Sequence, residues 1–351
     1  MRILRINCRG WFFLAILIFL ASACAPLSAA TDVLPSDTTA TDWYTVYFSQ
    51  PGSGTLRGGP DAALAAAIDA ARASVDAAIY DLNLWSIRDA LLAAQRRGVT
   101  VRIVTESDNL DRPELQELIA AGIEVLGDRR EALMHNKFVV IDRYEVWSGS
   151  MNLTLNGAYR NDNNLIRLRS SRLAEDFLVE FEEMFIDDQF GAYSPANTPN
   201  PVVTVEGTQV EVYFSPDDGA AARIVALIDG AEESVYFLAF SFTSDEIAQA
   251  MQRAEQRGVS VAGVFETGQA TNDGGEFFRM ADAGMDVRLD GNPDNMHHKV
   301  IIIDGRIVIT GSYNFSRSAE ERNDENLLVI DNSQIANLYL DEFNRIYADG
   351  Q

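Results

Sequence analysis

Cysteine, histidine and basic residues are all scarce in this chain of 351 residues. Its two cysteines, Cys8 and Cys24, exclude a disulfide framework and a cysteine-based zinc site. The three histidines are His135, His297 and His298, so any histidine chemistry must come from them. Lysine and arginine total 28 against 52 acidic residues, and the formal net charge is −24. Such a surface repels nucleic acid at long range unless a local basic site overrides it.

Long hydrophobic runs are also scarce, and the most apolar segment lies at the N-terminus. Trp11–Ala23 follows Arg2, Arg5 and Arg9 and is shorter than the ~20 residues of a membrane span. The end of this run and the residue after it, Leu20-Ala21-Ser22-Ala23-Cys24, resemble the lipobox of bacterial lipoproteins, whose cysteine is acylated. We therefore expect residues 1–24 to be a lipoprotein-type signal peptide, with the protein exported and anchored to the bacterial cell envelope by a lipid on Cys24. Cleavage near Ala25 or Ala30, giving a secreted or periplasmic protein, and a retained anchor are the alternatives.

The rest of the chain has the composition of a globular protein, with 47% hydrophobic and 23% charged residues. Residues 25–42 are rich in small and polar residues and predict a flexible tether. Beyond them the sequence repeats itself, since Gln95–Val101 is echoed by Glu255–Val261 and Met134–Lys137 by Met296–Lys299. We predict two similar domains, a first half at 43–192 and a second half at 209–351, joined by a Pro- and Asn-rich linker at 193–208.

Each half alternates strands and helices, which predicts an α/β fold with mixed sheets flanked by helices. Two such units are expected to pack about a pseudo-two-fold axis, with the site at their interface. In the first half we expect strands at 46–48, 75–80, 101–105, 124–126, 137–141, 146–148 and 165–168, and helices at 61–73, 113–121 and 173–185. A further helix should end at Gly98 in the first half and at Gly258 in the second.

The chemistry-bearing residues occur in the same pattern in both halves. The first half reads His135-x-Lys137-x4-Asp142-x6-Gly149-Ser150-x-Asn152, and the second reads His297-x-Lys299-x4-Asp304-x6-Gly311-Ser312-x-Asn314. Residues two apart on a strand share a face, so each half presents an imidazole and an ammonium together. Asp142 and Asp304 fall on the opposite face by parity and are expected to be structural. His298 also faces away and is given no role.

These residue types suit attack on a phosphodiester. Lys137, Lys299, Asn152 and Asn314 would bind the non-bridging oxygens and their growing charge. Two histidines supply one nucleophile and one general acid/base, so no metal or other cofactor is required. A buried His–Lys pair can also be a satisfied polar contact in a core. Two copies with identical Gly-Ser-x-Asn tails argue against that interpretation.

The duplicated motif resembles the HKD signature of the phospholipase D superfamily, over roughly residues 43–350. The second half is especially similar to the small bacterial exported endonucleases of that superfamily, which form one site by dimerising a single HKD unit. The resemblance implies two phospholipase D-like domains in one chain and a monomer that holds both half-sites. It also implies that His135 is the nucleophile that forms a phosphohistidine and that His297 is the acid/base.

A further equivalence concerns Asn163 and Glu325, which lie at matching positions after the two motifs. Members of the superfamily often hold a carboxylate here that bonds a catalytic histidine across the interface. The resemblance therefore pairs Glu325 with His135, and Asn163 with His297. An amide accepts a hydrogen bond but brings no charge, so the pKa of His297 is expected to be lower.

Three functions remain open from the sequence. The first is a phospholipase D that hydrolyses glycerophospholipids at a membrane surface to phosphatidate and the free head-group alcohol, favoured by the lipid anchor and the acidic chain. The second is an exported endonuclease that cleaves DNA or RNA. The third is an inactive binding or scaffold protein, which two intact motifs oppose. A nuclease normally has a basic track, whereas basic residues are scattered here, at Arg129, Arg130, Arg160, Arg317 and Arg322.

Overall fold

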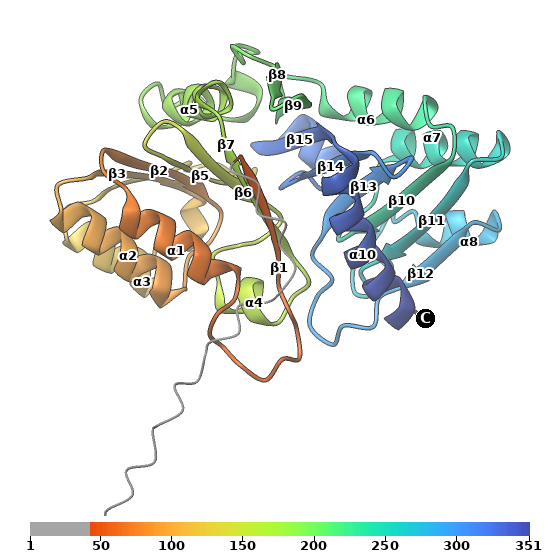
Figure 1. The fold of residues 1–351 in the computed structure, drawn as a ribbon, viewed down its shortest axis with the longest axis horizontal. Coiled ribbons are helices and arrows are strands. Elements are labelled where there is room, and N and C mark those ends of the chain that lie inside the picture. The colour runs from red at the N-terminus through yellow and green to blue at the C-terminus, as the bar shows by residue number, and fades with distance from the viewer. Residues whose placement is uncertain (1–42) are drawn as a thin grey trace, which may run out of the picture. The chain divides into compact units, whose positions relative to one another are not determined.

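The computed structural model describes residues 43–351, which form two mixed sheets with helices packed against them (Figure 1). This is the α/β architecture that the alternating pattern predicts. The predicted signal peptide, the tether and Cys24 lie outside the described residues. Within 43–351, no helix combines the length and the hydropathy needed to cross a membrane.

The first half builds a seven-stranded sheet in the order β1-β7-β6-β5-β2-β3-β4. β2, β3 and β4 are parallel, and the other neighbouring strands are antiparallel. The strands are β1 (Tyr44–Phe48), β2 (Ser74–Ile79), β3 (Thr100–Thr105), β4 (Glu124–Gly127), β5 (Lys137–Ile141), β6 (Glu145–Gly149) and β7 (Asn164–Arg169). The helices are α1 (Pro60–Ala70), α2 (Trp85–Arg96), α3 (Pro113–Ala120), α4 (Leu155–Tyr159) and α5 (Ser171–Phe185).

The second half repeats this topology in a sheet of order β12-β11-β10-β13-β14-β15-β9-β8. Read from β9 to β12, the spatial order of the strands is the same as that of the first sheet read from β1 to β4. The strands are β8 (Val202–Val205), β9 (Thr208–Ser215), β10 (Ser234–Ala239), β11 (Ser260–Phe265), β12 (Asp286–Leu289), β13 (Lys299–Ile303), β14 (Ile307–Gly311) and β15 (Glu325–Asp331). The helices are α6 (Ala220–Asp229), α7 (Asp245–Gln256), α8 (Phe277–Asp282), α9 (Arg317–Glu321) and α10 (Ser333–Asp349).

The strand β8 has no counterpart in the first half. It lies inside the segment 193–208, whose Pro- and Asn-rich sequence predicts only a linker. It forms a hairpin with β9 through Glu206 and Gly207, which both have positive φ. Such a two-residue turn matches the twist of the paired strands. The linker therefore extends the second sheet.

The two halves share one central core. α5 and α10 lie in this core, between the inner faces of the two sheets, whereas α1–α3 and α6–α8 cover the outer faces. Phe177 of α5 packs edge-on against Phe138 of the first half, with ring centroids 5.0 Å apart, and against Phe214 of the second, at 5.2 Å. Because apolar burial is the main stabilising term, this shared core fixes the halves against each other.

The one-turn helices α4 and α9 are elements that the sequence analysis missed. Each follows a Gly-Ser-x-Asn segment and is capped by a hydroxyl, Thr154 Oγ1 accepting from Gly157 N at 3.0 Å and Ser316 Oγ from Ala319 N at 3.2 Å. Five residues are too few to show a helical period. The capping residue is the signal that could have found them.

The glycines of the repeated motif are required by the backbone. Gly149 ends β6 with φ +144° and Gly311 ends β14 with φ +152°. A Cβ on Gly149 would collide with the carbonyl oxygen of Asn164, and one on Gly311 with that of Asn326. In both halves the neighbouring strand approaches too closely for any side chain.

Replacing Gly311 with alanine is expected to lower the free energy of unfolding by on the order of 3 kcal/mol, because strained backbone and a backbone collision add. Urea unfolding would measure this loss. Gly258→Ala is the matched control, since Gly258 has φ +92° but an added Cβ has nothing within 4 Å. That control should lose about 1 kcal/mol. Equal losses for the two variants would show that the collision contributes nothing.

Candidate active site

The two motifs are brought to one place by an exchange of backbone hydrogen bonds between the halves. His135 N donates to Asp324 O of the second half, and His297 N donates to Asp162 O of the first, both at 2.9 Å. These residues lie beside the isolated bridges Met134–Asp324 and Asp162–Met296. The backbone of each histidine, just before its strand begins, is therefore hydrogen-bonded to the other half.

Amide side chains reinforce this exchange one step deeper in the sheets. Asn164 Nδ2 donates to Thr310 Oγ1, and Asn326 Nδ2 to Ser148 Oγ, both at 2.6 Å. Asn326 Oδ1 also accepts from Lys137 N at 3.1 Å. Buried amides with several partners are geometrically demanding, so the two motifs are held in a defined register.

The histidine partners are those that the resemblance implies. His135 Nδ1 lies 2.7 Å from Glu325 Oε2, and His297 Nδ1 lies 2.9 Å from Asn163 Oδ1. Asn163 donates to Gly157 O, so its oxygen faces the imidazole and accepts from it. Both rings thus carry a proton on Nδ1, which leaves each Nε2 for chemistry.

The motif serines orient these two partners. Ser150 Oγ donates to Asn163 Oδ1 at 2.8 Å, and Ser312 Oγ donates to Glu325 Oε2 at 2.7 Å. The serine of each half thus fixes the group that bonds the histidine of the other half. Ser150 and Ser312 are therefore part of the support for the site.

The lysines lie buried beside the histidines. Lys137 Nζ donates to His135 O and Lys299 Nζ donates to His297 O, each at 2.9 Å. Burial lowers the pKa of Lys137 to about 7, although Glu325 and Asp81 oppose the shift. Burial and the neighbouring Lys137 hold the pKa of Lys299 well below its ordinary value.

Charges from both halves act on each histidine. Burial, followed by the ammonium groups of Lys137 and Lys299, holds the pKa of His135 well below 6.5. For His297 the causes of the lowered pKa are burial, then Lys299, Lys137, His135 and, last, His298. Burial raises the pKa of Glu325 to about 7. The arrangement concentrates positive charge in a buried space, which favours an anionic ligand.

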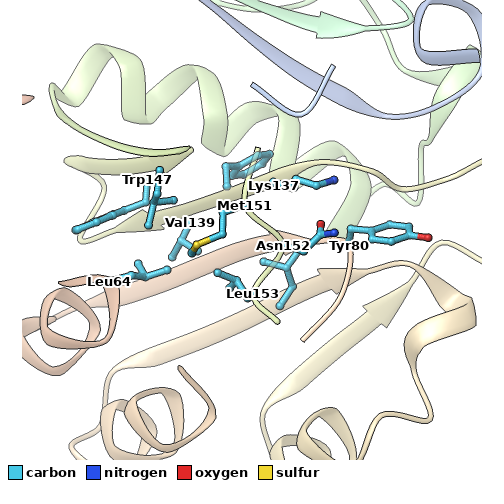
Figure 2. A pocket seen from close by; sticks show the side chains of 11 residues that line it. Leu64, Tyr80, Lys137, Val139, Trp147, Met151, Asn152 and Leu153 are labelled. Carbon is cyan, nitrogen blue, oxygen red and sulfur yellow. The ribbon is translucent and has the colours of Figure 1, made fainter. Parts of the chain in front are cut away.

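The motif asparagines carry amide groups that are unpaired in the described part of the chain. The amide oxygens of Asn152 and Asn314 are buried and have no hydrogen-bond partner within residues 43–351. Figure 2 shows the Asn152 amide beside Lys137 and Tyr80, at the edge of an apolar cavity. With a volume of ≈ 10 Å³, that cavity is barely large enough for one water. The Nδ2 groups of both asparagines also have no partner among residues 43–351, so each amide has a donor left for an anion.

The motif aspartates lie outside the site, as their parity predicts. Asp142 Oδ1 accepts from Ala73 N, and Asp304 Oδ1 from Glu233 N, both at 2.7 Å. Burial alone would raise their pKa values, but the donated backbone hydrogen bonds outweigh it and lower the pKa of both. They anchor the turns behind β5 and β13.

The side chain of His298 has its own partner, away from the hydrogen bonds of the two motif histidines. Its Nε2 lies 3.1 Å from Glu342 Oε1 of α10 in the core. In the described part of the chain, no group of three or more His, Cys, Asp or Glu side chains could hold a metal ion.

Two aromatic residues at the site were missed from the sequence. Tyr80 follows β2 and Phe240 follows β10, and each ring contacts the histidine and lysine of its own half. Their equivalent places in the repeat, each directly after a buried strand, were the available signal. A single aromatic residue after a buried strand is also common in a hydrophobic core, so the sequence alone does not assign it a function.

Proteins of known sequence are similar to part of this chain. A phospholipase D of Rickettsia prowazekii (strain Madrid E) is 37% identical over 133 residues, which is 38% of this chain and 65% of the relative. The human mitochondrial cardiolipin hydrolase is 35% identical over 130 residues, 37% of this chain and 52% of the relative. The alignments thus span less than two thirds of either relative.

The fold has a solved counterpart, and a family model matches both halves. The crystal structure of phosphatidylserine synthase from Haemophilus influenzae Rd KW20 superposes with a TM-score of 0.64 and 15% identity. It covers 87% of this chain and 86% of that one, a likeness of fold alone. The family described as "Cardiolipin synthase, PLD-like domain" matches residues 64–185 and 224–347. With that domain present twice, the chain belongs to the phospholipase D family.

Proposed function

We propose that this protein is a metal-independent phosphodiesterase that hydrolyses glycerophospholipids to phosphatidate and the free head-group alcohol. The observation that carries the proposal is the pair of buried His–Lys units, one from each half, held together by reciprocal hydrogen bonds. Relatives named phospholipase D and cardiolipin hydrolase support a lipid substrate.

In the first step, Nε2 of His135 attacks the phosphorus atom. A phosphorus–nitrogen bond forms, the bond to the head-group oxygen breaks, and His297 gives its proton to the leaving alcohol. Glu325, bonded to Nδ1 of His135, stabilises the positive charge that this ring acquires. His297 has an amide partner without charge, which suits a group that must give up its proton.

In the second step, Nε2 of His297 takes a proton from water, and the water oxygen attacks the phosphorus. The phosphorus–nitrogen bond breaks, phosphatidate is released, and both histidines return to their starting states. The phosphorus–oxygen bond to the head group, which breaks in the first step, and the bond that water forms to phosphorus in the second step both lie on the His297 side. The phosphohistidine on His135 is the only covalent intermediate.

The buried charges suit a phosphodiester anion. With both lysines protonated and Glu325 ionised, these three groups would leave one positive charge uncompensated, and a phosphodiester supplies one negative charge. When bound, this anion also favours the protonated form of His297 and so offsets the lowered pKa of the free site. Lys137, Lys299, Asn152 and Asn314 then bind the charged oxygens.

The surface disfavours a nucleic acid substrate. Of the scattered arginines, Arg129 pairs with Asp188, Arg130 with Asp324 and Arg317 with Glu321. Paired arginines contribute little to a basic track, and the chain as a whole carries −24 charges. An endonuclease is therefore the alternative that the activity assay must exclude.

Location is part of the proposal. Export and a lipid on Cys24, followed by the tether at 25–42, would hold the enzyme at a bacterial envelope membrane that contains its substrate. Since both half-sites lie in one chain, a monomer suffices for activity.

Purified protein without residues 1–24 should release head group and phosphatidate from phosphatidylcholine, phosphatidylethanolamine or cardiolipin vesicles and leave DNA and RNA intact. Activity should survive EDTA. His135→Ala and His297→Ala should each lower kcat by about 10³-fold or more. The control is His298→Asn, which copies Asn136 of the first half and should stay within a few-fold of wild type. Cleavage of DNA or RNA alone would refute the lipid substrate.

The pH dependence follows from the buried cations. Lys137 must be charged to bind phosphate, so kcat/KM should fall as pH rises through its pKa of about 7. The lowered pKa of His297 should make the fall begin below that value. Glu325 must be ionised to support His135, and its pKa is also about 7, so kcat/KM should fall on the acidic side as well. We therefore expect a narrow bell-shaped profile of kcat/KM close to neutrality, measured as a pH profile of head-group release.

Asn163→Glu should move the alkaline limb of that profile upward by as much as about one pH unit, towards the limit set by Lys137. It gives His297 a carboxylate partner, as Glu325 is for His135, and Asn161 stands where Asn323 donates to Glu325. A carboxylate stabilises the imidazolium and so raises the pKa of His297. The exposed Asn156→Glu adds the same charge elsewhere and is the control. An equal shift in both variants would contradict a direct effect on His297.

A further inference from the structure

The two His–Lys pairs rest on two aromatic rings at equivalent places. Tyr80 lies edge-on to His135 with ring centroids 5.0 Å apart, and Lys137 Nζ lies 5.1 Å from the centroid of the same ring. Phe240 lies 4.5 Å from His297, and Lys299 Nζ is 4.5 Å from its centroid. One ring in each half therefore contacts both the base and the cation.

The backbone fixes both rings in these positions. Ile79 pairs with Lys137 across β2 and β5, and Ala239 pairs with Lys299 across β10 and β13. The carbonyl of Tyr80 accepts from Asn109 Nδ2, and Phe240 N donates to His298 O, both at 2.8 Å. Each ring follows directly after a paired strand residue, so it has little freedom to leave the lysine.

A ring face carries partial negative charge and attracts a cation more strongly where water is excluded. Lys137 and Lys299 are only 5% and 1% exposed, so each ring helps to keep a buried ammonium charged. The edge contact with the imidazole restricts its rotation about the bond that aims Nε2. A leucine of similar burial would provide neither interaction.

The rings differ in one group, the hydroxyl of Tyr80. This hydroxyl has no hydrogen-bond partner within residues 43–351. Burial, then the charges of Glu106 and Asp81, raises the pKa of Tyr80, so the group remains a proton donor. In Figure 2 the hydroxyl lies at the end of the ring remote from Leu64 and Trp147, beyond the Asn152 amide. It is free to meet a bound molecule.

We propose that Tyr80 and Phe240 are the positioning residues of the two His–Lys pairs, and that the Tyr80 hydroxyl donates a hydrogen bond to one substituent of the phosphodiester. The inference rests on the proposed function. The hydroxyl makes the His135 side of the site polar, whereas Phe240 makes the His297 side apolar. A substrate with an acceptor group on one arm is thereby bound in one orientation.

The experiment compares Tyr80→Leu, Tyr80→Phe and Phe240→Leu with wild type in three measurements. These are kcat and KM on phospholipid vesicles, the pH profile of kcat/KM, and the NMR signals of the His135 ring, assigned with His135→Asn. Thermal unfolding establishes that each variant is folded. Tyr144→Leu, at an exposed tyrosine in the turn between β5 and β6, is the control for loss of a tyrosine.

Tyr80→Leu and Phe240→Leu should each lower kcat/KM by roughly 10–100-fold and move its alkaline limb down by about 0.5–1 pH unit, because the ammonium loses its aromatic partner. Tyr80→Leu should also shift the His135 signals. Tyr80→Phe keeps the ring, so it should raise KM by about 3–10-fold, change kcat less and leave the pH profile in place.

A wild-type profile in folded Tyr80→Leu and Phe240→Leu would overturn the positioning role, and an unchanged KM in Tyr80→Phe would overturn the contact of the hydroxyl. If Tyr80→Leu does not fold, Phe240→Leu and Tyr80→Phe decide the question. Wild-type protein inactive on every phospholipid would refute the proposed function. Unchanged His135 signals in Tyr80→Leu would then refute the positioning role as well.

Discussion

The structure depends on an exchange in which each half holds the motif-bearing strand of the other. His135 and His297 donate their backbone protons to Asp324 and Asp162, and neither half can make these bonds alone. The same loops carry Glu325 and Asn163, which bond the two imidazoles. Docking of the halves and assembly of the site are thus one event. A displacement of one sheet would break the support of both histidines together.

Burial of positive charge is the second constraint, and it explains why the support is so extensive. An ammonium taken from water loses hydration that only nearby dipoles, carboxylates and rings can replace. Lys137 and Lys299 receive a carbonyl oxygen, an aromatic face and the shared charge of Glu325. This replacement is incomplete, as the lowered lysine pKa values show. Under the proposed function, a bound phosphodiester would complete it at little further cost of reorganisation.

Much of this fold and site could be predicted from the sequence because the repeat fixed the equivalence of residues. Periodicity gave the long helices and the buried strands, and parity separated His135 and Lys137 from Asp142. The pairing of Glu325 with His135 came from family resemblance, since no local pattern reports a contact between residues 190 positions apart. Tyr80, Phe240, β8 and α4 were missed, because single aromatic residues and elements of four or five residues have no periodic signal.

The positions where the halves differ are as informative as those where they agree. Two identical half-sites would give both histidines the same basicity, so nothing in the free site would decide which ring attacks and which exchanges protons. Here the His, Lys, Asp, Gly, Ser and Asn residues of the motif are identical in the two halves, while Glu325 corresponds to Asn163, Tyr80 to Phe240 and His298 to Asn136. The first two pairs touch the imidazoles directly. Fusion of two copies into one chain permits such differences, because each position can then change without changing its counterpart.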